Sequence, residues 1–205
     1  MNYLDFIDDF TFEPFEDDDR VRITDIHNGR KTSFSKTGID PTLVDFYNQM
    51  DGFRFAWSVT NDNPDDSGSI KILPAADSFI DGKDLVYFDH TPADSPLRDF
   101  FFVDFFVDEA CVGVYRGRPE LPGMHDFEFE NATGPLHVDF EGYMQLLGAT
   151  KGFRYWHKAI LDHLAPNRTV ESAETTAFKT MMPQLFADFD YDAFIALYES
   201  LRIDR

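Results

Sequence analysis

The run from Arg98 to Val107 constrains the fold of this chain more than any other segment, because apolar side chains occupy both faces of the run when it is extended. A strand with two buried faces lies in the interior of a sheet rather than at its edge. The apolar residues of the run are Phe100, Phe101, Phe102, Val103, Phe105, Phe106 and Val107. The run therefore predicts a central strand, and we assign its rings to the core rather than to a ligand pocket.

Other segments are predicted to be strands of the same sheet. The clearest spans residues 53–59, where Phe53, Phe55 and Trp57 alternate with smaller or polar residues. The others span residues 21–26, 69–73, 85–88, 110–115 and 126–130. In the last of these, the alternation predicts that Phe127 and Phe129 face the core, with Asp126, Glu128 and Glu130 facing solvent. We expect a largely antiparallel sheet of about six strands.

Helices are predicted around the sheet and after it. Asp40 and Pro41 form a helix start, and the apolar stripe that follows ends at Gly52. Asp139 is expected to cap a helix that Gly148 ends, and further helices are expected over residues 153–164, 170–183 and 191–201. In the helix over 170–183 the expected apolar stripe is Val170, Ala173, Ala177 and Met181, and Pro183 is expected to kink or restart the helix.

The fold class is therefore α+β, because runs of strands are followed by runs of helices. We expect an acidic amino-terminal segment over residues 1–19 and an α+β domain over residues 20–165. A carboxy-terminal helical extension over residues 166–205 is expected to pack on the same domain.

The charge of the chain is strongly negative, since 18 Lys and Arg stand against 38 Asp and Glu, a net charge of −20. This argues against binding bare nucleic acid or an anionic membrane surface, both of which require clustered cations. The acids gather in three groups, which are residues 5–19, the loop 61–68 and residues 188–192. Such groups either keep a protein soluble or steer a basic partner towards it, and both interpretations stay open.

Chemistry-bearing motifs are few. The sequence contains no glycine-rich phosphate loop, nucleophile elbow or zinc-ligand spacing. Cys111 lies within a predicted strand and is expected to be a buried, inert thiol. His157 and His163 are six residues apart on one helix and face different ways, whereas His125 and His137 could approach across the sheet. We therefore expect no catalytic residues, no cofactor and no metal.

The sequence contains two weak metal-site patterns. The loop 61–66 offers oxygen ligands in alternation but lacks the glycine and the closing glutamate of an EF-hand, so we interpret it as a solvated hairpin loop. Asp65, Asp81 and Lys83 are spaced as in some metal-dependent nucleases, where acids hold Mg²⁺ and a lysine steadies the attacking water. Asp81-Gly82 also reads as an ordinary turn, and a metal-dependent hydrolase is the least favoured alternative.

The expected location is the cytoplasm. The single cysteine cannot form an internal disulfide, the chain opens with no charged-then-apolar leader, and no apolar run approaches the length of a membrane span. The oligomeric state is left open.

A family resemblance rests on two segments. In the first, the predicted helix 40–50 ends in an Asp51-Gly52 step. The predicted strands 53–59 and 68–73 follow, and Pro74 ends the second strand. In the second, the predicted helix that begins near His137 carries Phe140 and Tyr143 three residues apart. In order and spacing, these segments resemble SMI1/KNR4-like (SUKH superfamily) proteins over roughly residues 20–165. The acidic head and the helices after Pro166 depart from that pattern.

The resemblance implies an α+β fold with a curved sheet packed by helices, and a role in protein binding. Many bacterial members are immunity proteins that neutralise a co-encoded toxin, often a nuclease, and fungal members are scaffolds in signalling. No catalytic residues carry over, because the family is not built around a catalytic site.

We therefore expect a non-catalytic protein-binding module, an immunity protein that holds a basic partner, the cognate toxin, by an acidic surface. The first expected contacts are in the hairpin loop, which projects from the sheet: Asp62, Asp65 and Asp66. The second are in the head: Glu16, Asp17, Asp18 and Asp19. The alternative is an acidic DNA mimic or regulatory scaffold that binds a nucleic-acid-handling protein.

Overall fold

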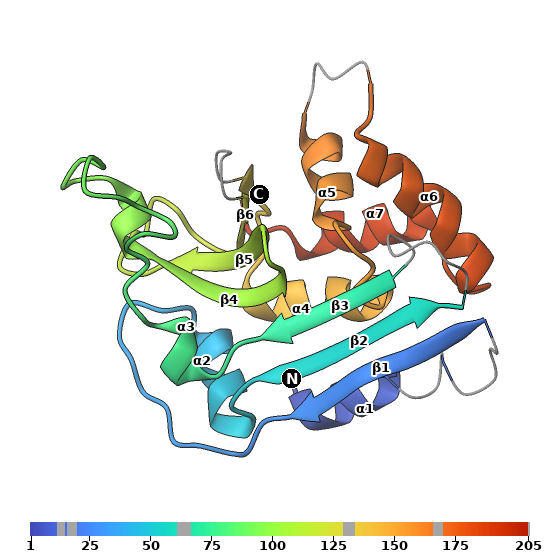
Figure 1. Cartoon of the computed structure of the whole chain (residues 1–205), viewed down its shortest axis with the longest axis horizontal. Helices are drawn as coiled ribbons and strands as arrows, with labels where there is room; N and C mark the ends of the chain where they lie inside the picture. Colours follow the sequence, from blue (N-terminus) through green and yellow to red (C-terminus); the bar gives the residue numbers. More distant parts are fainter. Residues whose placement is uncertain (12–14, 16–19, 61–66, 129–133, 166–169, 205) are drawn as a thin grey trace.

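A meander of seven strands forms the framework of the computed structural model (Figure 1), which describes residues 1–11, 15, 20–60, 67–128, 134–165 and 170–204. The strands lie in the sheet in the order in which they occur in the chain, and every neighbouring pair is antiparallel. They are β1 (Val21–Asn28), β2 (Phe53–Val59), β3 (Ser67–Ile72), β4 (Phe100–Val107), β5 (Ala110–Tyr115), β6 (His125–Glu128) and β7 (Gly134–Pro135). The predicted α+β class is confirmed, with seven strands rather than about six.

Strand β4 is the middle strand, as predicted, and its two faces enter two different cores. Val103 and Phe106 belong to the large core that the helices cover. Phe100 and Phe102 belong to a smaller cluster on the other face, which also contains Cys111 and Phe127. The strand is apolar on both faces because each face has its own layer of side chains to bury against.

The segment 85–88 was predicted to be a strand, and this prediction is wrong. The backbone N–H groups of Leu85 and Val86 both donate to the Gly82 carbonyl, at 3.2 and 2.8 Å, and an isolated bridge joins Lys83 to Tyr87. The segment is therefore a turn. A short apolar run does not by itself distinguish a strand from a turn, and Leu85 is largely exposed.

The expected outward orientation of Asp126 on β6 is also wrong. Asp126 is buried, and its Oδ2 atom lies 3.3 Å from Nζ of Lys158 on the helix α5 (His157–Leu164). Lys158 also pairs with Glu128. The Lys158 ammonium pairs with both carboxylates, and helix α5 can therefore cover this face of β6 although the residues on it are acidic. Phe129 and Glu130 lie outside the described residues.

Three helices cover the face of β1, β2 and β3 that points away from the viewer in Figure 1. They are α1 (Tyr3–Thr11), α2 (Pro41–Gln49) and α4 (Phe140–Thr150), with the short α3 (Ala75–Ser78) beside them. The predicted caps are confirmed: Asp40 accepts from the Thr42 N–H at 2.8 Å, and Asp139 from the Gly142 N–H at 2.7 Å.

Helix α1 was not predicted, because its segment was interpreted only as an acidic head. Tyr3 and Ile7 are fully buried one helical turn apart, whereas Asp5, Asp8 and Asp9 are exposed on the other side. The helix is thus amphipathic, with its acids facing solvent.

Helix α4 passes through Gly148, where we expected it to end. A Cβ atom at this position would lie 2.7 Å from Cζ of Phe6, so the glycine permits α1 to approach α4 closely. The helix instead ends at Lys151, which has a left-handed backbone with φ of 53°.

The last two helices are α6 (Ala173–Leu185) and α7 (Tyr191–Leu201), and Pro183 lies within α6. The predicted stripe of α6 is wrong, since its buried residues are Thr175, Phe178, Met182 and Leu185, while Val170 precedes the helix and is exposed. Asp190 caps α7, as predicted, by accepting from the Ala193 N–H at 2.7 Å. In the part of the chain that the structure describes, no helix combines the length and apolar character needed to cross a membrane.

Candidate functional site

The residues predicted to contact a partner lie outside the described residues: Asp62, Asp65, Asp66, Glu16, Asp17, Asp18 and Asp19. The residues that flank these two segments are described, and they show where each segment joins the fold. Arg20 follows the first segment, and Thr60 and Ser67 bracket the second.

The two segments join the fold side by side. The Thr60 N–H donates to the Arg20 carbonyl at 2.8 Å, and Val21 is aligned with Val59 in the sheet. Ser67 is in turn aligned with Ser58 at the start of β3. Both segments therefore attach at the end of the β1–β2–β3 sheet that lies on the right in Figure 1.

Phe15 anchors the head to the same end. Its side chain is buried, and its ring centroid lies 5.3 Å from that of Phe55 and 6.0 Å from that of Trp57. A third neighbour is Phe186, at 5.5 Å, which directly follows α6. These contacts hold the chain immediately before residues 16–19 against the sheet and against the α6–α7 connection.

The third acidic group, near the carboxy terminus, is also at this end. Nη1 of Arg20 donates to the Gln184 carbonyl at 2.9 Å, which joins the start of β1 to the end of α6. Asp188 and Asp190 follow in the α6–α7 connection, and both are exposed. We call this region the acidic end, defined by Phe15, Arg20, Thr60, Ser67 and residues 186–190.

A pocket of about 220 Å³ opens at the acidic end. Its apolar lining includes Phe186, Phe189 and Leu197, and its rim carries Asp188 and Asp190 together with one cation, Lys151. An apolar floor beside carboxylates suits the side chain of a lysine or arginine, whose aliphatic stem packs on apolar groups while its head stays at a polar rim. The arrangement can therefore receive a basic side chain from another protein.

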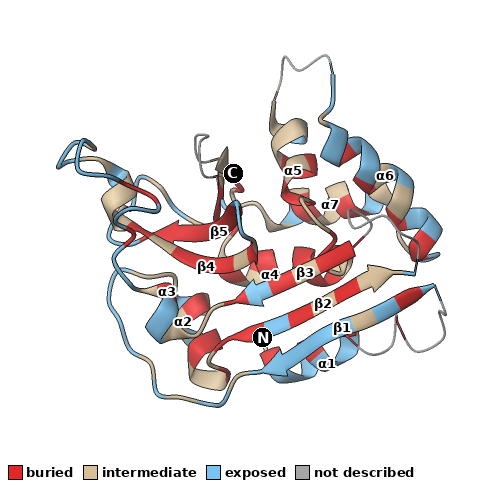
Figure 2. Ribbon diagram, in the orientation of Figure 1, coloured by how far each residue is buried: buried red, intermediate tan, exposed pale blue. Residues whose placement is uncertain are grey.

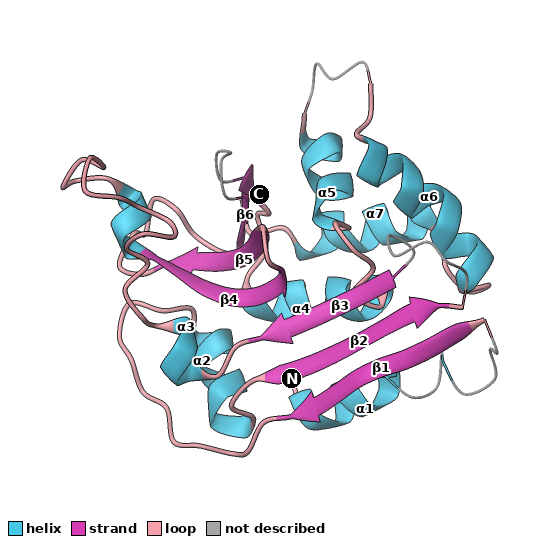
Figure 3. Cartoon of the chain, in the orientation of Figure 1, coloured by secondary structure: helices cyan, strands magenta, loops and turns pink. Residues whose placement is uncertain are grey.

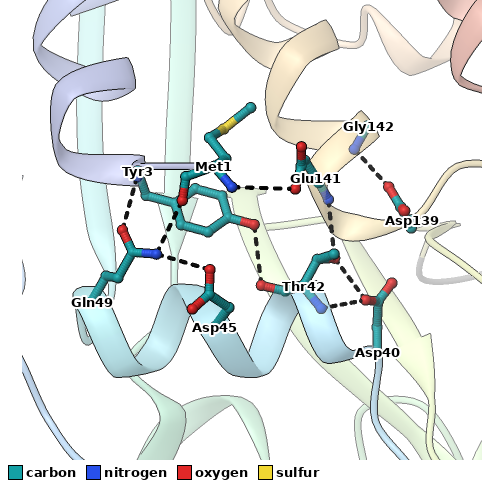
Figure 4. Close-up of polar contacts among 9 residues, drawn as sticks. All are labelled: Met1, Tyr3, Asp40, Thr42, Asp45, Gln49, Asp139, Glu141 and Gly142. Atoms are coloured by element: carbon teal, nitrogen blue, oxygen red, sulfur yellow. Dashed lines mark hydrogen bonds and ion pairs between the residues drawn. The ribbon is translucent and has the colours of Figure 1, made fainter.

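A second acidic cluster, around the amino terminus, has a structural role (Figure 4). Besides capping α2, the Asp40 carboxylate accepts from the Phe140 N–H at 3.1 Å, so it caps α4 as well. The amino group of Met1 lies 3.5 Å from Oε2 of Glu141. Burial raises the pKa of Asp139, and the hydrogen bond from Gly142 opposes this rise.

Around these carboxylates the remaining polar groups are also paired (Figure 4). The hydroxyl of Tyr3 donates to the Thr42 carbonyl at 3.1 Å. The amide of Gln49 donates to the Met1 carbonyl at 3.1 Å and to Asp45 at 2.9 Å. Asp40 and Glu141 join α1, α2 and α4 to one another, so we do not assign the acids of this cluster to a partner surface.

The alternative metal site is not assembled from its described members. Asp81 accepts hydrogen bonds from the Tyr87 hydroxyl and the Lys83 N–H, and Nζ of Lys83 lies 2.8 Å from Asp89. Asp65 lies outside the described residues. Within the described ranges, no group of three or more His, Cys, Asp or Glu side chains is placed to hold a metal ion.

The four histidines considered from the sequence, and Cys111, are buried in the fold or paired with a carboxylate. His137 lies 3.3 Å from Asp204, whereas His125 is buried against the ring of Tyr115, with centroids 4.9 Å apart. His157 is buried, and His163 pairs with Glu199 at 2.9 Å on a different side of α5. Cys111 is fully buried, as predicted, and burial raises the pKa of its thiol.

Sequence reasoning did not identify Phe15, Phe186 and Lys151 as parts of this region. The burial of Phe15 had no specific signal in the sequence, because Phe10 and Phe12 stand in the same acidic segment and apolar residues are common on protein surfaces. Lys151 reaches the pocket only because of how distant segments fold together, and the residues around it in the sequence do not indicate this position.

Comparison with known proteins identifies no relative. No family model matches the chain, and neither the curated proteins nor the solved structures contain a significant match.

Proposed function

We propose that this protein is a non-catalytic binding module that captures a basic partner protein with its acidic end. The observation that carries the proposal is the contact between Arg20 and Thr60, because it brings together, across 40 positions of sequence, the residue that follows the first acidic segment and the residue that precedes the second. The Arg20–Gln184 hydrogen bond adds the third acidic group to that place.

A concentration of carboxylates at one end creates a local negative field that steers a basic partner into contact. Such steering raises association rates and makes them sensitive to salt. The pocket between Phe189, Asp188 and Asp190 would then hold one lysine or arginine of the partner. Long-range attraction and a specific anchor are thus available at the same surface.

The partner that fits this surface best is a toxin with a basic substrate groove, such as a nuclease. A groove that binds phosphates is lined by Lys and Arg, and a cluster of carboxylates can occupy it in place of the phosphates. The resemblance to SMI1/KNR4-like immunity proteins supports this assignment, since its helix–strand–strand order corresponds to α2, β2 and β3. We place the protein in the cytoplasm, where such a toxin would act.

The first experiment is to purify the tagged protein from its native host at low and then at moderate salt, and to identify the proteins that salt releases. A basic toxin would support the proposal. A housekeeping protein that binds nucleic acid would replace it with the DNA-mimic alternative. An empty preparation, together with a rise in melting temperature on adding Mg²⁺ or Mn²⁺, would favour a metal-dependent hydrolase.

The second experiment tests the surface with the partner in hand. Changing Asp62, Asp65 and Asp66 to Asn should slow association at least tenfold at low salt and flatten its salt dependence. The control changes Asp77, Asp84 and Asp94 to Asn, which removes the same charge from the opposite end of the sheet and from the loop beyond it. Equal association rates for the two triple variants would contradict the assignment of the acidic end.

A further inference from the structure

Strands β1, β2 and β3 carry a row of basic residues. No helix lies in front of these strands in the view of Figure 1, where Figure 3 colours the helices apart from the strands. The strand register aligns His27 on β1 with Arg54 on β2, and Arg54 with Lys71 on β3. All three residues are exposed. Figure 2 shows the corresponding exposed stretches side by side at the end of β1, the start of β2 and the end of β3.

This row lies on the face that the helices leave open. On β2 the neighbours of Arg54 in sequence, Phe53 and Phe55, are buried under the helices, so Arg54 points the other way. Adjacent strands are about 4.8 Å apart, and the three side chains therefore start from backbone positions that span about 10 Å.

The row is unfavourable for the sheet itself, since like charges directly opposite each other on neighbouring strands destabilise the pair. Asp25 offsets part of this repulsion, because its Oδ2 atom lies 3.6 Å from Nε of Arg54 in a half-exposed ion pair. Among the described residues no carboxylate lies within 4 Å of the Lys71 ammonium, which instead lies over the ring of Phe105 at 5.7 Å.

Protection of a sheet edge does not account for the row. Cations placed on an edge strand prevent that edge from pairing with another chain. Arg54 and Lys71, however, are on β2 and β3, and both of these strands are paired on both sides. Edge protection is therefore not the reason for the row, and a bound anion would offset the repulsion between Arg54 and Lys71.

A pocket of about 250 Å³ opens at the row. His27, Arg54 and Lys71 line one part of it, and Leu73 and Pro74 line another. This volume lies just below the range of about 300–1,000 Å³ that is usual for ligand pockets, so the site suits a small molecule.

Two acids also line this pocket. Asp51 is used within the fold, because its Oδ1 atom accepts from the Ala75 N–H at 2.7 Å. Asp77 is exposed at the first turn of α3 and can accept a hydrogen bond from a hydroxyl group. The pocket thus has a basic part, an apolar part and an acceptor.

We propose that this pocket binds a small phosphate-bearing molecule, with its phosphate on Arg54 and Lys71, its organic part on Leu73 and Pro74, and His27 as a third donor. A phosphate presents several strong acceptor oxygens, which suits donors arriving from three neighbouring strands. The site lies at the opposite end of β2 from the acidic end, and it does not depend on the function proposed there.

Titration of the ¹⁵N-labelled full chain, followed by NMR, tests the site. Inorganic phosphate, pyrophosphate and glycerol phosphate are added at constant ionic strength, with sodium chloride as the blank. Saturable shifts are expected at the backbone amides of Arg54, Lys71 and their neighbours. Shifts that stay linear, or that match the chloride blank, would overturn the proposal.

Variants separate a built site from general attraction of anions. Changing Arg54 and Lys71 to Gln together should weaken binding of the tightest probe at least tenfold. The matched control changes Arg22 and Lys31 to Gln; Arg22 is on the same strand as His27, aligned with Ser58 towards the other end. Equal loss in both double variants would overturn the proposal.

The melting temperature of the same variants is a second measurement. Removal of two facing cations relieves repulsion in the sheet, so the Arg54/Lys71 variant should melt at the same temperature as the parent protein or above it. Its loss of binding then cannot result from unfolding. Saturation by an acidic peptide without saturation by any of the phosphates would overturn the assigned ligand class.

Discussion

The carboxylate of Asp104 accepts a hydrogen bond of 2.7 Å from the hydroxyl of Tyr143, which joins β4 to α4 inside the core. Its other oxygen accepts from the Lys71 N–H at 2.7 Å, so this side chain also joins β3 to β4. The Tyr143 oxygen lies 3.2 Å from Nε2 of His157. Burial raises the pKa of Asp104 to about 6 and lowers that of His157 well below its usual value.

The first prediction concerns the pH dependence of stability at Asp104. The folded pKa of about 6 exceeds the ordinary value of 3.8 for an aspartate, so this group stabilises the fold fully below about pH 4 and loses that contribution as the pH rises through 6. The Asp104→Asn variant lacks this titration and keeps an acceptor for Lys71. Its stability relative to the parent protein should therefore rise by about 2 kcal/mol between pH 4 and pH 7.

Urea unfolding of both proteins at pH 4, 5, 6 and 7 measures this difference. The contribution of neutral His157 has the opposite pH dependence, because its folded pKa is lowered, but it is common to both proteins and cancels. Parallel stability curves would show that Asp104 has an ordinary pKa.

The second prediction concerns Asp40, which caps α2 and α4 together. The Asp40→Ala variant loses both caps, and loss of a single cap costs 0.5–2 kcal/mol, so we expect a loss of about 2 kcal/mol in the free energy of unfolding. The control is Asp94→Ala at an exposed position, which should change stability by less than about 0.5 kcal/mol. Similar unfolding midpoints for the two variants would refute the double cap.

The third prediction concerns Gly68, which lies opposite Trp57 in the β2–β3 hairpin. A Cβ atom there would lie 2.1 Å from Nε1 of Trp57, which donates to the Lys151 carbonyl at 2.7 Å. The Gly68→Ala variant must displace the indole and should lose at least about 2 kcal/mol. Tryptophan fluorescence should shift as well, whereas Gly82→Ala, where the backbone is not left-handed and a Cβ atom would lie 3.3 Å from the Val86 side chain, serves as a control for the loss of a glycine. An unchanged spectrum and midpoint would contradict the contact.

The fourth prediction concerns the thiol of Cys111. A fully buried thiol with a raised pKa is protonated and inaccessible, so a thiol reagent such as DTNB should react only as fast as the protein opens. A Ser33→Cys variant adds an exposed thiol in the same chain and should be labelled at once at that position. Full labelling of the parent protein in native buffer within seconds would contradict the burial.

Several elements could be predicted because their signals are local. Asp40 and Pro41 specify a helix start through one hydrogen bond and one fixed dihedral angle. The apolar run of β4 requires two buried faces wherever the strand is placed. The hairpin of β2 and β3 follows from alternation interrupted by a polar loop.

Other features depended on contacts between distant segments. Asp126 was placed on the wrong face because the cation that pairs with it, Lys158, is 32 residues away. Helix α1 had a local signal, since Tyr3, Phe6, Ile7 and Phe10 recur at the i, i+3, i+4 and i+7 spacing of an amphipathic helix, but the segment was interpreted only by its acidic residues. The turn at 82–86 depends on bonds to the Gly82 carbonyl, which periodicity does not reveal.

The sequence by itself determined the secondary structure with strong local patterns, the α+β class and the uneven distribution of charge. Only the tertiary structure decided that Arg20, Thr60 and Gln184, which border the acidic segments, meet at one end of the sheet and that His27, Arg54 and Lys71 form one row. Strand register and helix docking set these neighbours. Register and docking minimise the free energy of the whole core, so no single segment carries the information that places one charged group beside another.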